Sequence, residues 1–392
     1  MARRETPAAG PGSRALIVDV VRSAVSISRV ELAERTGLTQ PSISNIVRDL
    51  IADGVIHETG SEDSVRGKPR KLLAITPATR FGIGFQLGPD TVTCVAIDLT
   101  GGVVGREVVP LDDTGLADQL AARFDDFIVD LDLPRDRIEG LAVVAAAAPP
   151  SHRDNPPEWA AARRALAARL GIPVLVENDA AAAALGEFWT RRVSREQAFG
   201  SVYLSAGVGA GLVFGGALFR GTSFDAGELG HLSIAYDGRP CPCGNRGCVE
   251  RYASMAATVE AARDAGLAVD QKSMFSAYDA IAHAAVSGDP DAFAVVDRAA
   301  GYLSVAVTSM ANLLDLGRIV LTGPGMAIAG SIYARRLRSH LAATAHARYR
   351  HDVVVELSAQ PRDAAGIGAA ALVVQASIAP GHTAGPAGPD GP

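Results

Sequence analysis

One histidine and three closely spaced cysteines constrain the fold of this chain more than any other feature. The cysteines are three of the four in the sequence, and they follow the histidine in the stretch GELGHLSIAYDGRPCPCGNRGCVE. The four residues are His231, Cys241, Cys243 and Cys248. One imidazole and three thiolates complete a closed tetrahedral set, so we expect Zn²⁺ as a structural cofactor. Gly244 and Gly247 allow the loop to fold tightly enough for these residues to reach one ion.

The composition is typical of a globular protein of the cytoplasm. The 392 residues are 48% hydrophobic, which suffices for the cores of about two or three domains. The N-terminus lacks the apolar run of a signal peptide, and Gly, Pro or charged residues interrupt the longer apolar stretches. We therefore expect a cytoplasmic protein without a membrane span.

Charge is distributed unevenly along the chain. Residues 1–80 hold 12 Lys and Arg against 9 Asp and Glu, whereas the remainder holds 25 against 34. A mildly basic segment in front of an acidic body favours a nucleic-acid-binding module at the N-terminus. The excess is too small to establish this interpretation by itself.

Three helices are predicted within this basic segment. The apolar residues of 14–25 recur at helical spacing. A second helix begins after Ser28, whose capping box is completed by Glu31, and it ends at Gly37. A third helix begins after Thr39, which is a favourable N-cap residue. Two helices joined by a short glycine-containing turn are typical of a helix-turn-helix, although an ordinary three-helix bundle with a solvated face fits the same pattern.

The third helix presents a polar face that suits DNA. Short polar side chains near its start can reach base edges, and an arginine can reach a base or a phosphate. The candidate DNA-contacting residues are Thr39, Gln40, Ser42, Ser44, Asn45 and Arg48.

A basic connection between two predicted strands follows the third helix. The strands are VIHETG and KLLAIT, and the connection contains Arg66, Lys68 and Arg70. A thin cationic finger of this kind suits a narrow minor groove, and its alternative interpretation is a flexible basic loop. We therefore predict a winged helix-turn-helix over residues 13–77, after a flexible segment at 1–12.

From residue 78 onward, predicted strands alternate with helices. This order is typical of an α/β sheet protein, and it predicts two lobes at 78–178 and 179–378 with a cleft between them. The closing helix is placed so that it can return to the first lobe. The final residues, 379–392, have the composition of a disordered tail.

Three motifs are expected at this cleft. Asn178 and Asp179 stand at the end of a strand and the start of a helix, where they can bind ligand hydroxyls or cap the helix. The glycine-rich stretch 205–211 can bring N–H groups to a phosphate or can merely permit close packing. The third motif consists of Glu228, His231 and Glu250.

These motifs resemble those of the ROK family of repressors and sugar kinases. The stretches GVGAGLVFGGALFRGTSFDAGELGH, CPCGNRGCVE and ENDAAAAALGE carry the resemblance, which extends over almost the whole chain. It implies an α/β fold in which a winged helix-turn-helix precedes a two-lobed, actin-like domain of the sugar-kinase, ribonuclease-H-like type, assembled as a homodimer or homotetramer. It implies sugar-contacting residues at Asn178, Asp179, Glu228, His231 and Glu250, and zinc ligands at His231, Cys241, Cys243 and Cys248.

The chemistry of these residues agrees with the resemblance. Amide, carboxylate and imidazole groups together satisfy vicinal hydroxyls as donors and as acceptors. One nitrogen of a neutral imidazole can ligate zinc while the other meets a sugar hydroxyl, so that the metal fixes the tautomer of His231.

The nucleotide-binding motif of the family's kinases is altered in this chain. Those kinases use the aspartate matching Asp179 as general base and an Asp-x-Gly-Gly-Thr-Lys turn to position the phosphates and Mg²⁺. Residues 86–91 read QLGPDT here, so Gln86 replaces the acid and Pro89 removes a backbone donor. The stretch GPG at 323–325 also departs from the consecutive glycines of the family. We therefore expect neither ATP nor Mg²⁺ as a cofactor, and no catalytic residue.

The predicted function is a sugar-responsive, DNA-binding transcriptional regulator, a repressor of genes for carbohydrate uptake or metabolism. Its expected partners are a palindromic operator and a sugar or sugar phosphate. The alternatives are an ATP-dependent, glucokinase-like sugar kinase, a bifunctional kinase-regulator, and a regulator controlled by a protein partner. The segment 145–159 lacks the Pro-Gly turn of the family, so one wall of the pocket is expected to differ.

Overall fold

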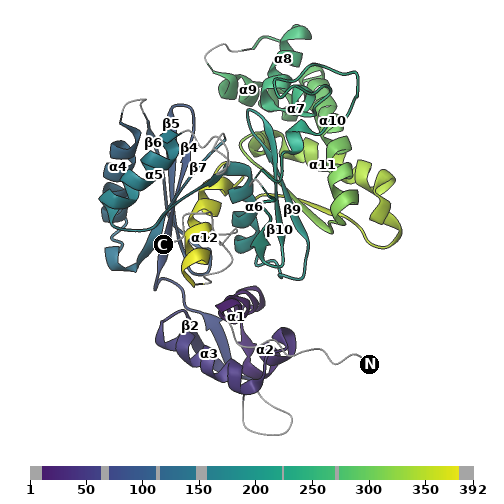
Figure 1. The fold of residues 1–392 in the computed structure, drawn as a ribbon. Helices are drawn as coiled ribbons and strands as arrows, with labels where there is room; N and C mark the ends of the chain where they lie inside the picture. Colours follow the sequence, from purple (N-terminus) through teal and green to yellow (C-terminus); the bar gives the residue numbers. More distant parts are fainter. Residues whose placement is uncertain are drawn as a thin grey trace.

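A small N-terminal domain and two α/β lobes make up the computed structural model of this protein (Figure 1). The structure describes residues 11–62, 70–111, 115–146, 157–222, 225–269 and 273–378. The α/β class agrees with the prediction. No helix within these ranges is both long enough and apolar enough to span a bilayer.

The N-terminal domain, residues 11–76, is called the head below. Its elements are α1 (Pro11–Ala24), β1 (Ile27–Ser28), α2 (Arg29–Thr36), α3 (Gln40–Ala52), β2 (Ile56–Glu62) and β3 (Arg70–Ile75). The central strand β3 pairs antiparallel with both β1 and β2, which produces the wing. Ser28 and Glu31 form the predicted capping box, and Gly37 ends α2 with a φ of 71°, a left-handed conformation that favours glycine.

Lobe 1 is built on a five-stranded sheet with the order β6-β5-β4-β7-β8. Its strands are β4 (Phe81–Leu87), β5 (Thr91–Asp98), β6 (Val103–Pro110), β7 (Ile138–Ala145) and β8 (Val174–Asn178). The first three are antiparallel neighbours, and the last two run parallel to β4. α4 (Leu116–Asp130) and α5 (Pro157–Leu170) pack against each other and share a core with the sheet.

Lobe 2 repeats this strand order in a second sheet, β11-β10-β9-β12-β13. Its strands are β9 (Phe199–Leu204), β10 (Val208–Phe214), β11 (Ala217–Leu218), β12 (Arg318–Thr322) and β13 (Val354–Leu357). Its helices include α7 (Glu250–Ala253), α8 (Met255–Asp264), α9 (Met274–Val286), α10 (Pro290–Leu314) and α11 (Met326–Thr344). Again three antiparallel strands precede two parallel ones, so the two lobes share one topology.

Two buried helices lie between the sheets (Figure 1). α6 (Asp179–Thr190) packs on β9 and β10, whereas α12 (Ala364–Ile378) packs on β4, β5 and β7. The two helices run against each other, and glycines set how closely they approach. A Cβ on Gly186 would lie 2.8 Å from the carbonyl oxygen of Ala364, and one on Gly368 would overlap the carbonyl oxygen of Ala182. The small residues of both helices therefore permit a contact that larger side chains would prevent.

Gly368→Ala is expected to destabilise the protein, because the added Cβ overlaps the backbone of α6. Overpacking costs about 1–3 kcal/mol, which exceeds the ~1 kcal/mol that alanine gains over glycine in a helix. Urea unfolding followed by circular dichroism measures the change in the free energy of unfolding. Gly317→Ala is the control, because a Cβ there has nothing within 4 Å. Equal effects of the two substitutions would contradict the packing argument.

Candidate functional site

A cavity of about 540 Å³ opens between the lobes beside the N-terminal end of α6. Ala146, just after β7, and most of β8 line it from lobe 1, and β9, β10 and the segment 225–231 line it from lobe 2. All of the residues predicted to contact sugar lie along its wall. They are Asn178, Asp179, Glu228, His231 and Glu250. Residues far apart in the sequence thus converge on one polar cavity, although their contact with a sugar stays a prediction.

Asn178 and Asp179 have different positions and contacts at the start of α6. Asn178 is the N-cap, and its Oδ1 accepts hydrogen bonds from the amides of Ala180 at 2.9 Å and Ala181 at 3.2 Å. Asp179 is the first helical residue, and its Oδ1 accepts from Ala180 N at 2.8 Å. Asn178 thus caps the helix through its side-chain oxygen, while Asp179 brings a carboxylate to the positive end of the helix dipole.

Burial governs the protonation of Asp179, whose side chain is only 8% exposed. Loss of hydration raises the pKa of Asp179 to about 6, against the hydrogen bond from Ala180, and the nearby Glu228 carboxylate adds to the rise. Burial also raises the pKa of Tyr203, which lies at the same cavity, far above its ordinary value.

Glu250 is held against the glycine-rich turn of lobe 2. Its Oε2 accepts a hydrogen bond from Val208 N at 3.1 Å, and a Cβ on Gly207 would overlap the same carboxylate. A Cβ on Gly209 would lie 2.6 Å from the Cβ of Ala180, so this glycine brings β10 close to α6. Of the two interpretations of the glycine-rich stretch 205–211, these contacts correspond to the one in which the glycines permit close packing.

His231 lies between the cavity and the segment 241–248, which carries the three cysteines and is called the cysteine loop below. It is the last residue of the short 3-10 helix η2 (Leu229–His231). Nδ1 lies 3.6 Å from the Sγ of Cys241, and Nε2 lies 3.9 Å from Oε2 of Glu228. Partial burial raises the pKa of Glu228, and the Asp225 and Glu250 carboxylates add to this effect.

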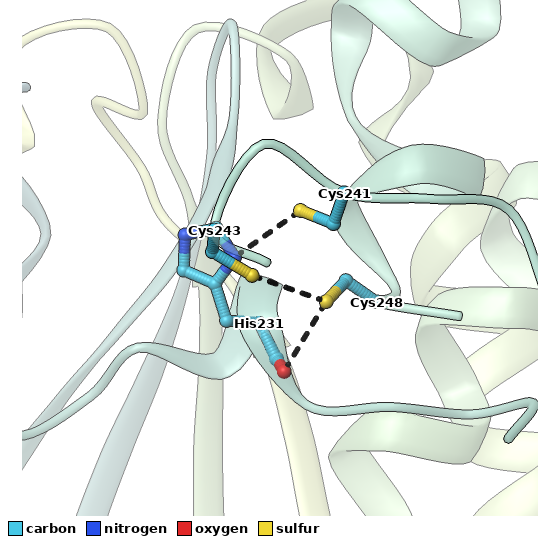
Figure 2. A group of neighbouring side chains, drawn as sticks. All are labelled: His231, Cys241, Cys243 and Cys248. Atoms are coloured by element: carbon cyan, nitrogen blue, oxygen red, sulfur yellow. Dashed lines mark hydrogen bonds between the residues drawn. The ribbon is translucent and has the colours of Figure 1, made fainter. Parts of the chain in front are cut away.

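The predicted metal ligands gather at one point of the cysteine loop (Figure 2). The ligand atoms of His231, Cys241, Cys243 and Cys248 all lie within 4.8 Å of one another. The sulfurs of Cys243 and Cys248 are 3.7 Å apart, close to the ~3.8 Å edge of a tetrahedron built on zinc–sulfur bonds of about 2.3 Å. Gly247 is indispensable to the loop, because its φ is 69° and a Cβ would overlap the carbonyl oxygen of Ala235. The cluster therefore fits a tetrahedral metal ion.

Sequence reasoning missed an ion pair at the cavity wall. Arg220 Nε donates to Oε2 of Glu177 at 2.8 Å, with side chains 15% and 12% exposed. The other carboxylate oxygen of Glu177 accepts from Asn178 N at 3.1 Å. The pair thus ties the end of β8 in lobe 1 to lobe 2. No local pattern could have found it, because the partners are far apart in the sequence.

Gln86 takes part in a second contact between the lobes. Its Nε2 donates to the hydroxyl of Tyr203 at 3.2 Å, and its Oε1 accepts from Gly366 N at 3.2 Å. The altered turn at 86–91 therefore presents a neutral amide whose ends are engaged by β9 and by the start of α12. The stretch 323–325 packs against the end of β9, where Gly325 N donates to Leu204 O at 2.9 Å.

The predicted DNA-contacting residues lie mainly on the outer face of α3. Gln40, Ser44, Asn45 and Arg48 are exposed. The hydroxyls of Thr39 and Ser42 are 2.9 Å apart, and Thr39 caps α3, so both are engaged in the helix start. Arg70 is exposed at the base of the wing, while Arg66 and Lys68 lie outside the described residues, as does most of the altered segment 145–159.

Two protein-family patterns match parts of this chain. The sequence pattern of the ROK family matches residues 83–376, and that of a winged helix-turn-helix DNA-binding domain matches residues 16–57. The chain belongs to the ROK family.

Relatives of this ROK protein include both regulators and kinases. It is 26% identical to the xylose repressor of Bacillus subtilis over 75% of this chain and 77% of that protein. The structure of a ROK transcriptional regulator, a homologue of the Escherichia coli MLC protein, matches 93% of this chain and 96% of that one with a TM-score of 0.71 and 26% identity. A ROK glucokinase from Streptomyces griseus, in complex with glucose and AMPPNP, matches 74% of this chain and 98% of its own with a TM-score of 0.61 and 25% identity.

This ROK protein combines two kinase-like lobes with a DNA-binding head. Its two lobes share the fold of the ROK kinases, and its head adds a DNA-binding winged helix-turn-helix. Because the regulator structure matches the head as well as the lobes, this chain is a transcriptional regulator of the ROK type, as the sequence predicted.

Asp179→Asn is expected to stabilise the unliganded protein, and the gain is expected to depend on pH. The folded carboxyl, with a pKa of about 6, binds its proton more tightly than the unfolded one, so ionisation opposes folding. Stability from this group is complete below about pH 4 and is lost as the pH rises through 6. The difference in unfolding free energy between variant and wild type should therefore grow to about 3 kcal/mol by pH 7.

Urea unfolding at closely spaced pH values between 4 and 8 measures this difference. Asp126→Asn serves as the control, because the Asp126 side chain is 68% exposed. A difference between Asp179→Asn and wild type that does not change with pH would contradict the burial argument.

Proposed function

We propose that the protein is a sugar-responsive repressor of genes for carbohydrate uptake or metabolism. A homodimer or homotetramer would present pairs of α3 helices and wings to a palindromic operator. A sugar or sugar phosphate in the cavity between the lobes would change the operator affinity. The observation that carries this proposal is the convergence of the predicted sugar residues on one cavity in a chain that also has a DNA-binding head.

The polar wall of the cavity supports a polyhydroxylated effector. Carboxylates accept hydrogen bonds from hydroxyls, whereas the amide of Asn178 and the imidazole of His231 supply donors. The excess of acceptors suits a ligand that has many hydroxyl protons to donate. The names of the relatives agree with this class, since one is a xylose repressor and another is a glucokinase in complex with glucose.

The contacts of Gln86 support a regulator without kinase activity. Phosphoryl transfer needs groups that position Mg²⁺ and the phosphates. Gln86 offers no charge for Mg²⁺, and its amide is already bonded to Tyr203 and Gly366. The retained Asp179 is explained by hydroxyl binding, because an acceptor there serves a sugar whether or not a phosphate is transferred.

The sugar would change the operator affinity by binding two conformations of the protein with different affinities. A ligand shifts an equilibrium only as far as its affinities for the two conformations differ. The cavity is walled by both lobes, so a sugar that contacts both would favour a closed arrangement. The spacing of the two heads on the operator would change with that closure.

Operator binding is expected to respond to a sugar that fits the cavity. Selection from random duplex DNA identifies the operator, and gel shifts measure its affinity with D-xylose, D-glucose, N-acetyl-D-glucosamine and their phosphates. We expect one of them to change the affinity at least tenfold, within the range of ordinary allosteric coupling. Asp179→Asn should bind the operator but lose the response, whereas Asp126→Asn should keep it.

Two outcomes would contradict parts of this proposal. If no sugar alters operator binding, the sugar response is wrong and control by a protein partner becomes the better explanation. If the protein consumes ATP in the presence of a responsive sugar, and Asp179→Asn abolishes this turnover, the chain is a bifunctional kinase-regulator.

We also propose that the cysteine loop holds structural zinc. His231, Cys241, Cys243 and Cys248 would fill all four positions of the ion, which would brace the loop and fix the tautomer of His231. The opposite ring nitrogen would then face Glu228 at the cavity, where it can bind a sugar hydroxyl. Such an ion positions the binding loop and has no free position for chemistry.

Metal analysis of the purified, reduced protein is expected to find about one zinc per chain. Cys243→Ser should lose the metal and weaken the sugar response, because the loop that carries His231 loses its brace. Cys94→Ala is the matched control, since Cys94 is buried in lobe 1 away from the cluster. Wild-type protein that contains no metal would contradict the assignment.

A further inference from the structure

An arginine of the head is buried against the two lobes, which are together called the body below. Arg22, near the end of α1, is 2% exposed. Its Nη1 donates to the carbonyl oxygens of Phe188 and Trp189, each at 3.2 Å, and its Nη2 donates to that of Val193 at 3.1 Å. These carbonyls belong to the last turn of α6 and the residues just after it, so Arg22 binds the C-terminal end of that helix.

Charge and aromatic contacts reinforce the position of Arg22. Its guanidinium carbon lies 4.7 Å from the centre of the Phe188 ring and 5.2 Å from that of Trp189. Burial lowers the pKa of Arg22 to about 10, while the buried Asp19 opposes that shift, so the group stays protonated at neutral pH. A positive charge at the C-terminal end of a helix also interacts favourably with the helix dipole.

The opposite end of the same helix lies at the cavity. Asn178 caps α6 there, and Asp179 and Ala180 form part of the cavity wall. The helix has 12 residues, so it spans about 18 Å at 1.5 Å per residue. One short helix therefore joins the candidate sugar site to Arg22, one of the residues through which the head contacts the lobes. Oδ2 of Asp19, also in α1, lies 3.8 Å from Nη1 of Arg195, and α1 also contacts α12.

Close packing makes α6 unsuited to bending between its ends. Every residue from Asp179 to Trp189 is buried. A Cβ on Gly209 or Gly211 of β10 would collide with α6, as would one on Gly368 of α12. Packed interiors transmit a displacement because they contain little free space. A shift imposed at the first turn therefore reaches the last turn.

We propose that α6 transmits the occupancy of the cavity to the head, with Arg22 as the positioning residue through which the head follows the helix. This inference rests on the proposed function, which supplies a ligand at one end and an operator at the other. The new element is the structural route, α6 and Arg22, between the cavity and the head. Arg80 offers a competing route, because it binds Glu139 of lobe 1 at 2.7 Å and the Asp53 carbonyl of the head at 3.2 Å, and neither partner belongs to α6.

The test uses the full chain and needs no sugar. Coupling is reciprocal, so operator binding at the head must affect the cavity end of α6. The measurement is hydrogen–deuterium exchange of the amides of 180–184, with and without the selected operator duplex. We expect the operator to change exchange there about tenfold in the wild type and less than about twofold in Arg22→Lys, which keeps the charge but cannot make the same three bonds.

Two control variants define the route. Arg80→Met should respond to the operator like the wild type, and so should Arg14→Met, whose native arginine pairs with Asp53 within the head. Arg22→Gln repeats the test with a neutral side chain, and circular dichroism verifies that each variant is folded. Because Arg22→Lys retains the positive charge beside Asp19, it is the variant expected to fold.

The outcomes separate this inference from the proposed function. An unchanged response in Arg22→Lys and Arg22→Gln, or an equal loss in Arg80→Met, would overturn the route through α6. A wild type that binds operator but ignores every sugar would refute the sugar response alone, since the exchange measurement still decides the coupling. A chain that selects no DNA would overturn both.

Discussion

The contact between α6 and α12 is the constraint on which the rest of the structure depends. Each helix belongs to the sheet of one lobe, and the two cross at a separation that only glycine and alanine allow. Because this contact lies between the sheets, it determines how the lobes face each other and hence the shape of the cavity. It also fixes the direction of α6, whose first turn carries Asn178 and Asp179 and whose last turn receives Arg22.

Polar side chains add an ion pair and hydrogen bonds between the lobes to the packing of α6 against α12. Arg220 and Glu177 join the lobes at the cavity wall, and Gln86 joins β4 to Tyr203 and to the start of α12. One of these contacts lies at the wall of the cavity, and the other involves the strand that leads into the turn at 86–91. The chain therefore has the two-lobed fold of the ROK kinases, and the neutral amide of Gln86 links its lobes.

Local signals made much of this protein predictable from its sequence. The capping box at Ser28, the glycine stop at Gly37 and the cysteine cluster each depend on neighbours a few residues away, and each has its predicted place in the structure. The contacts of Arg22, Gln86 and Arg220 depend on partners more than a hundred residues distant or in another lobe. No periodicity encodes such pairs. The one available hint was that Asp19 and Arg22 stand within the largely apolar stretch ALIVDVVR, a pattern that favours a charge buried with partners.

The docking of Arg22 bears on how such regulators are assembled in evolution. A DNA-binding domain attached by a plain tether could be exchanged freely between effector domains. This head carries a buried cation whose hydrogen-bond partners are carbonyls of the other domain, so transplantation to a body without them would leave those hydrogen bonds unmade. Head and body should therefore diverge as a matched pair, and recombination between paralogues should be tolerated only where the end of α6 is retained.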